Sequence, residues 1–270
     1  MNKYPYRFGW KKDKADARDL NFSVQFRLPA TLPPAVDLRA KCSPVKDQGQ
    51  LGSCTAQALV GALEFLEIKA GVKFADLSRL FVYYNELAAE GNVGKDSGAQ
   101  LRTGIKVLKK LGCCREDAWP YDIKKFKDRP APICYTKAAD HQVTAYQRLT
   151  TAAEMKACLA MELPFVFGWW VYESALTDKV AKTGDIPMPS WRERVMGAEG
   201  GHAVIAVGYD DTKEVILFRN SWSDKWGQAG YGTLPYTYFN GSLSADLWCI
   251  QGTESDLYAM YKKSSDNVIA

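Results

Sequence analysis

The sequence has only two histidines among its 270 residues, little excess charge of either sign and no long apolar run. A Cys/His metal site therefore has few candidate ligands, and the spacings of the seven cysteines match no zinc pattern. The formal net charge of +4 is too small to indicate nucleic-acid binding. No apolar stretch approaches the roughly 18 residues of a membrane span. We therefore expect no metal, no cofactor, no nucleic acid and no membrane among its partners, and a monomer.

The N-terminus also lacks the apolar core of a signal peptide. Either the protein stays in the cytosol, or a signal peptide is missing from this sequence. Residues 1–34 are polar and basic, and Pro33 and Pro34 favour an extended end to this leader. Its aromatic residues alternate in "YPYRFGW", which suits an extended strand with one buried edge.

The hydrophobic pattern changes period along the chain. Helical spacing covers 54–71, 77–91, 99–112 and 151–162, the last with Thr151 and Glu154 as a capping box. Short, apolar, β-rich segments follow at 164–172, 202–209 and 214–219, and the turn "DDTK" predicts that the last two form a hairpin. We therefore predict an α+β fold with a cleft between its halves: leader 1–34, a mainly helical half 35–140 and a β-rich half 141–270.

The stretch "DQGQLGSCTAQA" places Cys54 where a helix is expected to begin. Unpaired N–H groups and the helix dipole lower the pKa of a thiol at that position. A buried packing role is the commoner fate of a single cysteine. A nucleophile also needs a base and a group that orients the base, and the predicted hairpin brings His202 and Asn220 to one end.

These residues and their surroundings resemble the papain-like cysteine peptidases. The segments "PVKDQG", "GSC", "HAVIAVGY" and "NSWSDKWGQAGYG" stand in the order of that family's motifs. The resemblance implies a papain-like α+β fold. It also implies that Cys54 is the nucleophile, His202 its acid–base partner and Asn220 the orienter of His202, with Gln48 and the Cys54 backbone N–H as the oxyanion hole. A thiolate–imidazolium pair is then expected before substrate arrives.

The resemblance further suggests which residues bind the polypeptide substrate. Gly98 and Ala99 would pair with its backbone, and Trp222 would cover the Asn220–His202 contact. The remaining substrate-binding candidates are Leu101, Gly168, Ala203 and Trp226. Of these, Leu101, Gly168 and Ala203 would wall the pocket for the side chain two residues before the scissile bond, so we expect apolar or aromatic side chains there.

The sequence departs from the family at positions next to the nucleophile. Leu51 stands where a disulfide-bonded cysteine is usual, and neither Asp96 nor Ser97 supplies its partner, so that disulfide is absent. Cys114 and Cys134 flank the loop 119–132, and a disulfide between them would hold it; Cys113 could replace Cys114.

Two alternatives to an endopeptidase remain open. One is a catalytically inactive papain-like binding module, and the other is an acyl transferase that passes the acyl group to an amine. The family is commonly made as zymogens, whose inhibitory segments are usually longer than this leader and helical, whereas this one is predicted not to be. We expect some of residues 4–26 to cover or border the cleft. The resemblance slightly favours secretion or export.

Overall fold

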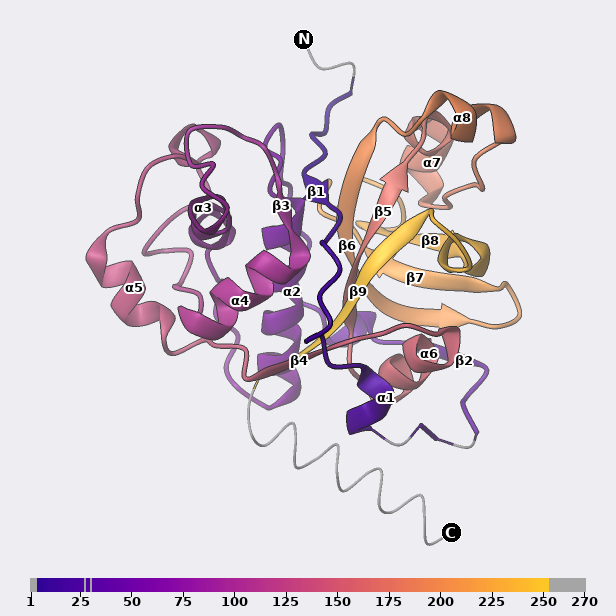
Figure 1. Ribbon diagram of the computed structural model, residues 1–270, viewed down its shortest axis with the longest axis horizontal. Helices are drawn as coiled ribbons and strands as arrows, with labels where there is room; N and C mark the ends of the chain where they lie inside the picture. Colours follow the sequence, from indigo (N-terminus) through magenta and orange to yellow (C-terminus); the bar gives the residue numbers. More distant parts are fainter. Residues whose placement is uncertain (1–3, 27, 30, 253–270) are drawn as a thin grey trace, which may run out of the picture.

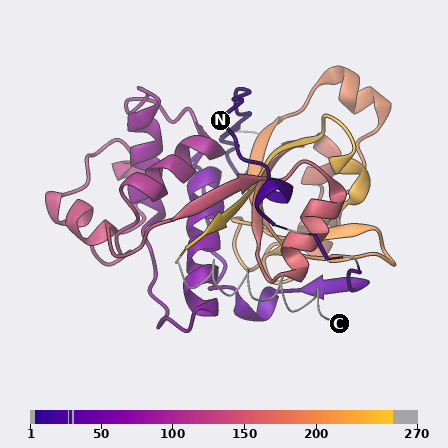
Figure 2. The ribbon, with the colours of Figure 1, turned by 60° about the horizontal axis from the view of Figure 1, so that its bottom comes forward.

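The computed structural model describes residues 4–26, 28–29 and 31–252. A helical half and a β-rich half lie side by side, and the leader runs between them along one face (Figures 1 and 2). The helices are α1 Phe22–Gln25, α2 Cys54–Lys69, α3 Arg79–Ala89, α4 Leu101–Lys110, α5 Pro132–Ala138, α6 Ala152–Ala160, α7 Asp178–Thr183 and α8 Trp191–Met196. The strands are β1 Trp10–Lys11, β2 Ala35–Asp37, β3 Ala99–Gln100, β4 Ala145–Arg148, β5 Phe165–Val171, β6 Gly200–Asp210, β7 Val215–Arg219, β8 Tyr231–Pro235 and β9 Ser244–Gln251.

Three of the predicted helices form the helical half. Helix α2 is buried along nearly its whole length, because α3 and α4 cover one side and β6 of the sheet covers the other. Such a helix has little amphipathic pattern, and most of its stability comes from burial. Helix α3 begins at Ser78, whose hydroxyl accepts the Phe81 N–H at 3.1 Å. The N-terminus of α2 therefore lies at the junction of the two halves.

The second half is an antiparallel sheet in the order β4-β9-β5-β6-β7-β8, and β2 pairs with β6 as a seventh strand. The predicted hairpin is confirmed, since β6 and β7 pair from Ile205↔Arg219 to Asp210↔Val215. The capping box of Thr151 and Glu154 at the start of α6 is also confirmed. Strands β5 and β6 are almost entirely buried. The sheet thus holds the first residues of β6 and the end of β7 at one edge of the cleft.

Several elements were not expected from the sequence. Helix α5 starts where the predicted loop 119–132 ends, and α7 and α8 precede β6. Strands β4 and β9 were not predicted: β4 is a short edge strand, and β9, which lies between β4 and β5, is mostly buried. The leader, predicted to lack helix, contains the single turn α1. No helix in the described ranges is long and apolar enough to cross a membrane.

Candidate active site

Cys54 is the first residue of α2 and is completely buried. The backbone of Ala203, at the start of β6, lies next to its thiol, as does the backbone of Gly9 from the leader. The two halves therefore meet at this sulfur atom, which lies where the helix N-terminus favours negative charge.

His202 and Asn220 come together as the hairpin predicted. The Nε2 atom of His202 lies 2.8 Å from Oδ1 of Asn220, and both side chains are buried. That contact fixes the ring with Nε2 as donor and leaves Nδ1 as the nitrogen able to exchange a proton. Nδ1 has no hydrogen-bond partner among the described residues. Ala203, the residue after His202, lies next to the Cys54 thiol, so the backbone of β6 brings His202 to the same end of the cleft as Cys54.

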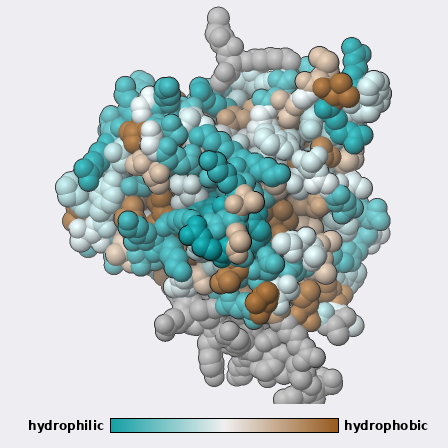
Figure 3. Space-filling view, in the orientation of Figure 1, coloured by the Kyte–Doolittle hydropathy of each residue, from teal (hydrophilic) through white to brown (hydrophobic). Residues whose placement is uncertain are grey.

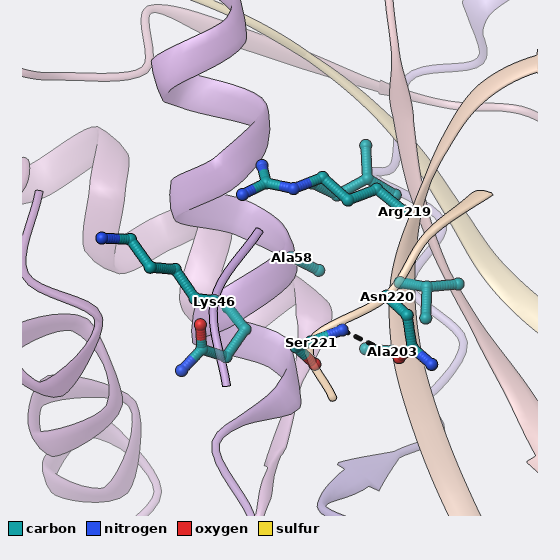
Figure 4. A pocket seen from close by; sticks show the side chains of 9 residues that line it. Lys46, Ala58, Ala203, Arg219, Asn220 and Ser221 are labelled. Carbon is teal, nitrogen blue, oxygen red and sulfur yellow. Dashed lines mark hydrogen bonds between the residues drawn. The ribbon is translucent and has the colours of Figure 1, made fainter. Parts of the chain in front are cut away.

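Gln48 is held by Ser221, a residue that the sequence analysis did not single out. The Ser221 hydroxyl donates to Oε1 of Gln48 at 2.6 Å, and the Gln48 backbone N–H donates to the Ser221 carbonyl at 2.9 Å. Nε2 of Gln48 consequently points the other way, toward the carbonyl of Leu51 at 2.9 Å. Figure 4 shows Asn220 and Ser221 together, joined by the Ser221 N–H bond to Oδ1 of Asn220. Two neighbouring residues of the segment "NSW" therefore orient the site: Asn220 holds the His202 imidazole, and Ser221 holds the side-chain amide of Gln48.

Two tryptophans shield this arrangement from solvent. Trp222 stacks on His202 with ring centroids 4.6 Å apart, and Trp226 packs edge-on against Trp222 at 5.4 Å. Both indoles are almost completely buried. Among the described residues, no three His, Cys, Asp or Glu side chains are grouped as metal ligands would be. The site thus consists of a thiol, an imidazole, two amides and an aromatic cover.

Comparison with known proteins agrees with this geometry. The family model described as papain family cysteine protease matches residues 32–240. The chain belongs to the papain family of cysteine proteases. Xylellain, a cysteine protease from Xylella fastidiosa, is similar to it in structure, with a TM-score of 0.83, 39% identity, and coverage of 94% of this chain and 98% of xylellain.

Two curated proteins are also similar to this chain in sequence. An uncharacterized peptidase C1-like protein of Acanthamoeba polyphaga mimivirus is 38% identical, over 90% of this chain and 86% of its own length. Chymopapain of Carica papaya is 26% identical over 74% of this chain, and the match spans 54% of chymopapain. The papain-like α+β fold and the assignment as a cysteine peptidase are therefore confirmed.

The leader of this papain-family chain passes directly over the site. The carbonyl of Arg7 accepts Nε2 of Gln48 at 2.8 Å, and the carbonyl of Gly9 accepts the Ala99 N–H at 2.8 Å. Gly9 is enclosed on both sides: a Cβ atom on it would lie 1.9 Å from the Gly52 carbonyl oxygen. A Cβ on Gly98 would lie 2.0 Å from the Gly9 carbonyl oxygen. Strand β1 then pairs in parallel with β3, Trp10 opposite Ala99.

The aromatic residues of the leader face the site at alternate positions. Tyr6 stacks on Trp222 at 4.2 Å between centroids, and Phe8 packs edge-on to His202 at 6.5 Å. Between them Pro5 and Arg7 are exposed, and Trp10 is 3% exposed. The regular strand is shorter than predicted, since β1 covers only Trp10–Lys11 and residues 4–9 form no strand, but the aromatic side chains do lie on the candidate catalytic residues.

Trp10 packs against Gly168, one of the three residues that the sequence analysis assigned to a substrate pocket. A Cβ atom on Gly168 would lie 1.9 Å from the Trp10 ring, and Gly201 approaches the same ring. Leu101 and Ala203, the other predicted wall residues, are buried nearby at the starts of α4 and β6. The far end of the pocket is polar, because Nε1 of Trp10 donates to Asp246 at 3.2 Å. The sequence analysis missed this carboxylate.

Asp246 owes its position to an irregular turn of the chain within β9. The register of β9 against β5 shifts between Val166 and Gly168, and Asp246 has a φ of 56°. A bulge of this kind re-aims a side chain, and aspartate tolerates the left-handed conformation better than most residues. Asp246 is 3% exposed.

Burial under the leader determines the protonation of the catalytic pair. Desolvation raises the pKa of Cys54 to about 12 and lowers the pKa of His202 to about 4, even though Asn220 favours the imidazolium. In this leader-covered form the neutral thiol and neutral imidazole are therefore favoured at pH 7. The ion pair expected from the sequence is not favoured in this form, because burial in the folded chain desolvates both charged groups.

Polar contacts occupy the position of the missing family disulfide. The Asp96 carboxylate accepts the Gly52 N–H at 3.0 Å, next to Leu51, and forms an ion pair with Arg7 at 2.7 Å. Asp96 thus joins the loop before Cys54 to the loop before β3 and also holds the leader. All seven cysteines are free thiols in this structure, and the thiols of Cys114 and Cys134 are neighbours.

Proposed function

We propose that the protein is an endopeptidase in which Cys54 is the nucleophile and His202 the acid–base group. Asn220 orients His202, while Gln48 and the Cys54 backbone N–H stabilise the oxyanion. The observation that carries this proposal is the contact of Gln48 with the Arg7 carbonyl beside Cys54, because it supplies a peptide carbonyl bound at the proposed oxyanion donor. The leader passes on both sides of Cys54, from Tyr6 to Trp10, which supports a cleft that accepts the interior of a polypeptide.

The chemistry follows from these positions. The Cys54 sulfur attacks the substrate carbonyl, its proton passes to Nδ1 of His202, and the negative charge on the carbonyl oxygen is held by Gln48. One such donor typically contributes about 3–4 kcal/mol to transition-state stabilisation. His202 then protonates the departing amine, which leaves a thioester on Cys54. Water, deprotonated by His202, hydrolyses the thioester and restores the thiol.

Variants of the nucleophile test the proposal. We expect Cys54→Ala and His202→Ala each to abolish hydrolysis of a peptide substrate, and the double variant to be little worse than either. Cys42→Ala removes a half-buried thiol outside the site and is the matched control. A thiol-reactive epoxide should label Cys54, whereas an inactive binding module would not be labelled there. Normal turnover by Cys54→Ala would refute the proposal.

We further infer that the leader is an intramolecular inhibitor of this site. The leader covers the site at several points: Tyr6 lies on Trp222 and Phe8 lies against His202. Trp10 packs on Gly168, and the Gly9 backbone lies next to the Cys54 thiol. A substrate needs these same contacts, so the leader has to withdraw before substrate binds. Product analysis with an added amine distinguishes hydrolysis from acyl transfer once the leader is displaced.

A further inference from the structure

Asp13, three residues after Trp10 in the leader, has its carboxylate surrounded by hydrogen-bond donors. The Asp13 side chain is completely buried. Its Oδ1 accepts the backbone N–H of Arg102 at 3.2 Å, and its Oδ2 accepts Nε1 of Trp248 at 2.9 Å. Oδ2 also lies 3.3 Å from Nη2 of Arg148. A neutral N–H, an indole N–H and a guanidinium thus converge on one carboxylate.

All three donors belong to the catalytic domain and come from regular elements. Arg102 is in the first turn of α4, where backbone N–H groups have no partner within the helix and the dipole favours an anion. Trp248 on β9 is fully buried, and Arg148 on β4 lies over its ring at 4.2 Å. The Arg102 N–H and the Trp248 indole are therefore held by their own helix and strand. The Arg148 guanidinium keeps the Trp248 ring and Asp246 as partners outside the leader.

The charge around this site changes sign when the acidic residues of the leader leave. Arg148 pairs with Asp13, Asp19 and Asp246, and Arg102 pairs with Asp19. Three carboxylates then face two guanidinium groups. If the leader withdraws, it takes Asp13 and Asp19 with it and leaves two guanidinium groups facing Asp246 alone. The uncovered site has one positive charge in excess and a buried indole N–H without its acceptor, so one acidic occupant would balance the charge and satisfy the donor, while burial and the neighbouring Asp246 raise the pKa of the carboxyl that occupies it.

The position of the site links it to the cleft. Gly9 lies at Cys54, Trp10 fills the next pocket, and Asp13 lies farther out on the same side. By resemblance, the Trp10 pocket receives the side chain two residues before the scissile bond. The carboxylate site therefore lies within reach of a substrate side chain three to five residues before that bond. Figure 3 shows mainly hydrophilic side chains over this part of the leader and α4.

We propose that the Arg102 backbone N–H, Nε1 of Trp248 and the Arg148 guanidinium form a subsite for an acidic side chain of the polypeptide substrate, which Asp13 occupies while the leader is in place. This inference rests on one part of the proposed function, namely that the leader covers the cleft in which the substrate binds. An arrangement that served merely to anchor the leader would confer no selectivity once the leader is displaced.

The test uses the full chain with Gly9→Val, because a side chain at Gly9 collides with the Gly52 backbone and excludes the leader from the cleft. Gly9→Ala serves if the valine variant does not fold. Peptides that carry Phe two residues before the scissile bond are compared with either Asp or Asn scanned over the third to fifth positions before it. We expect kcat/KM to favour Asp at one of these positions by about tenfold.

Three further variants decide which groups are responsible. Arg148→Gln and Trp248→Phe, each combined with Gly9→Val, should bring the Asp/Asn ratio close to one. Arg115→Gln, which removes an exposed arginine paired with Asp117, should leave the ratio unchanged. Equal rates for Asp and Asn peptides, or a ratio that survives both Arg148→Gln and Trp248→Phe, overturns the subsite.

A binding experiment separates this inference from the proposed catalysis. The double variant with Cys54→Ala and Gly9→Val lacks the proposed nucleophile, so it should bind peptides without cleaving them. Fluorescence anisotropy then measures its affinity for the labelled Asp and Asn peptides. Tighter binding of the Asp peptide, lost with Arg148→Gln, supports the subsite even if no variant hydrolyses peptides. Equal binding of the two peptides, or binding of neither, rejects the subsite even if hydrolysis is found.

Discussion

The side-chain amide of Gln48 donates to the backbone carbonyl of Arg7 at 2.8 Å. Gln48 is the proposed oxyanion donor of the site, and Arg7 belongs to the leader of the same chain. The donor is therefore occupied by a peptide carbonyl before any substrate arrives. Asp96 reinforces this by pairing with the Arg7 guanidinium at 2.7 Å.

We predict that the leader can cover the active site only because residue 9 is a glycine. A Cβ at this position meets the backbone of Gly52 at 1.9 Å, and backbone cannot move aside as a flexible side chain can. We expect Gly9→Val to raise both peptide hydrolysis and the rate of Cys54 alkylation at pH 7, by at least about tenfold. Gly94→Val is the control, since nothing lies within 4 Å of a Cβ there. Unchanged alkylation of a folded Gly9→Val protein would contradict inhibition by the leader.

Ser221 is predicted to act on catalysis through Gln48. Its hydroxyl donates to Oε1 of Gln48 at 2.6 Å, which turns Nε2 toward the cleft. In the Gly9→Val background, Ser221→Ala should lower kcat about tenfold with little change in KM, because the oxyanion donor is needed most in the transition state. Ser242→Ala, an exposed serine, is the comparison. An equal rise in KM with kcat unchanged would instead indicate a role in substrate binding.

Asp13 should make the stability of the protein depend on pH. Burial and the neighbouring Asp246 raise its pKa to about 6, although the Trp248 and Arg102 donors lower it. A raised carboxyl pKa means that the folded state binds the proton more tightly, so this contribution is complete below pH 3.8 and is lost as the pH rises through 6.

Denaturant unfolding between pH 4 and pH 7.5 measures this effect. The free energy of unfolding should fall by up to about 3 kcal/mol through Asp13, and Asp13→Asn should remove that part of the pH dependence. Asp117→Asn, at an exposed carboxylate, should retain it. Identical pH profiles for the wild type and Asp13→Asn would show that Asp13 does not titrate in this range.

Cys114 and Cys134 remain the predicted disulfide pair. They are free thiols in this structure, but their side chains are neighbours. Mild oxidation by diamide should therefore link them and raise the melting temperature by constraining the loop before α5. Cys134→Ser should abolish that gain, whereas Cys42→Ser should not. Peptide mapping without reduction that finds both thiols free after oxidation would refute the pairing.

The sequence by itself determined the family, the α+β fold and the catalytic candidates. Cys54, His202, Asn220 and Gln48 stand in local motifs, and the chemistry of a helix start and of a hairpin end can be read from neighbouring residues. The aromatic alternation of the leader was also visible, because a strand with one buried edge leaves a period of two.

Only the tertiary structure decided what the buried edge of the leader covers and which distant groups meet there. Asp246 lies on a bulge of β9, and its contact with Trp10 joins positions with no local pattern in common. The same holds for the contact of Ser221 with Gln48. The shifts in the pKa of Cys54 and of His202 come mainly from burial in the folded chain. Solvent exclusion depends on how distant segments pack together, so it cannot be predicted from the spacing of sequence motifs.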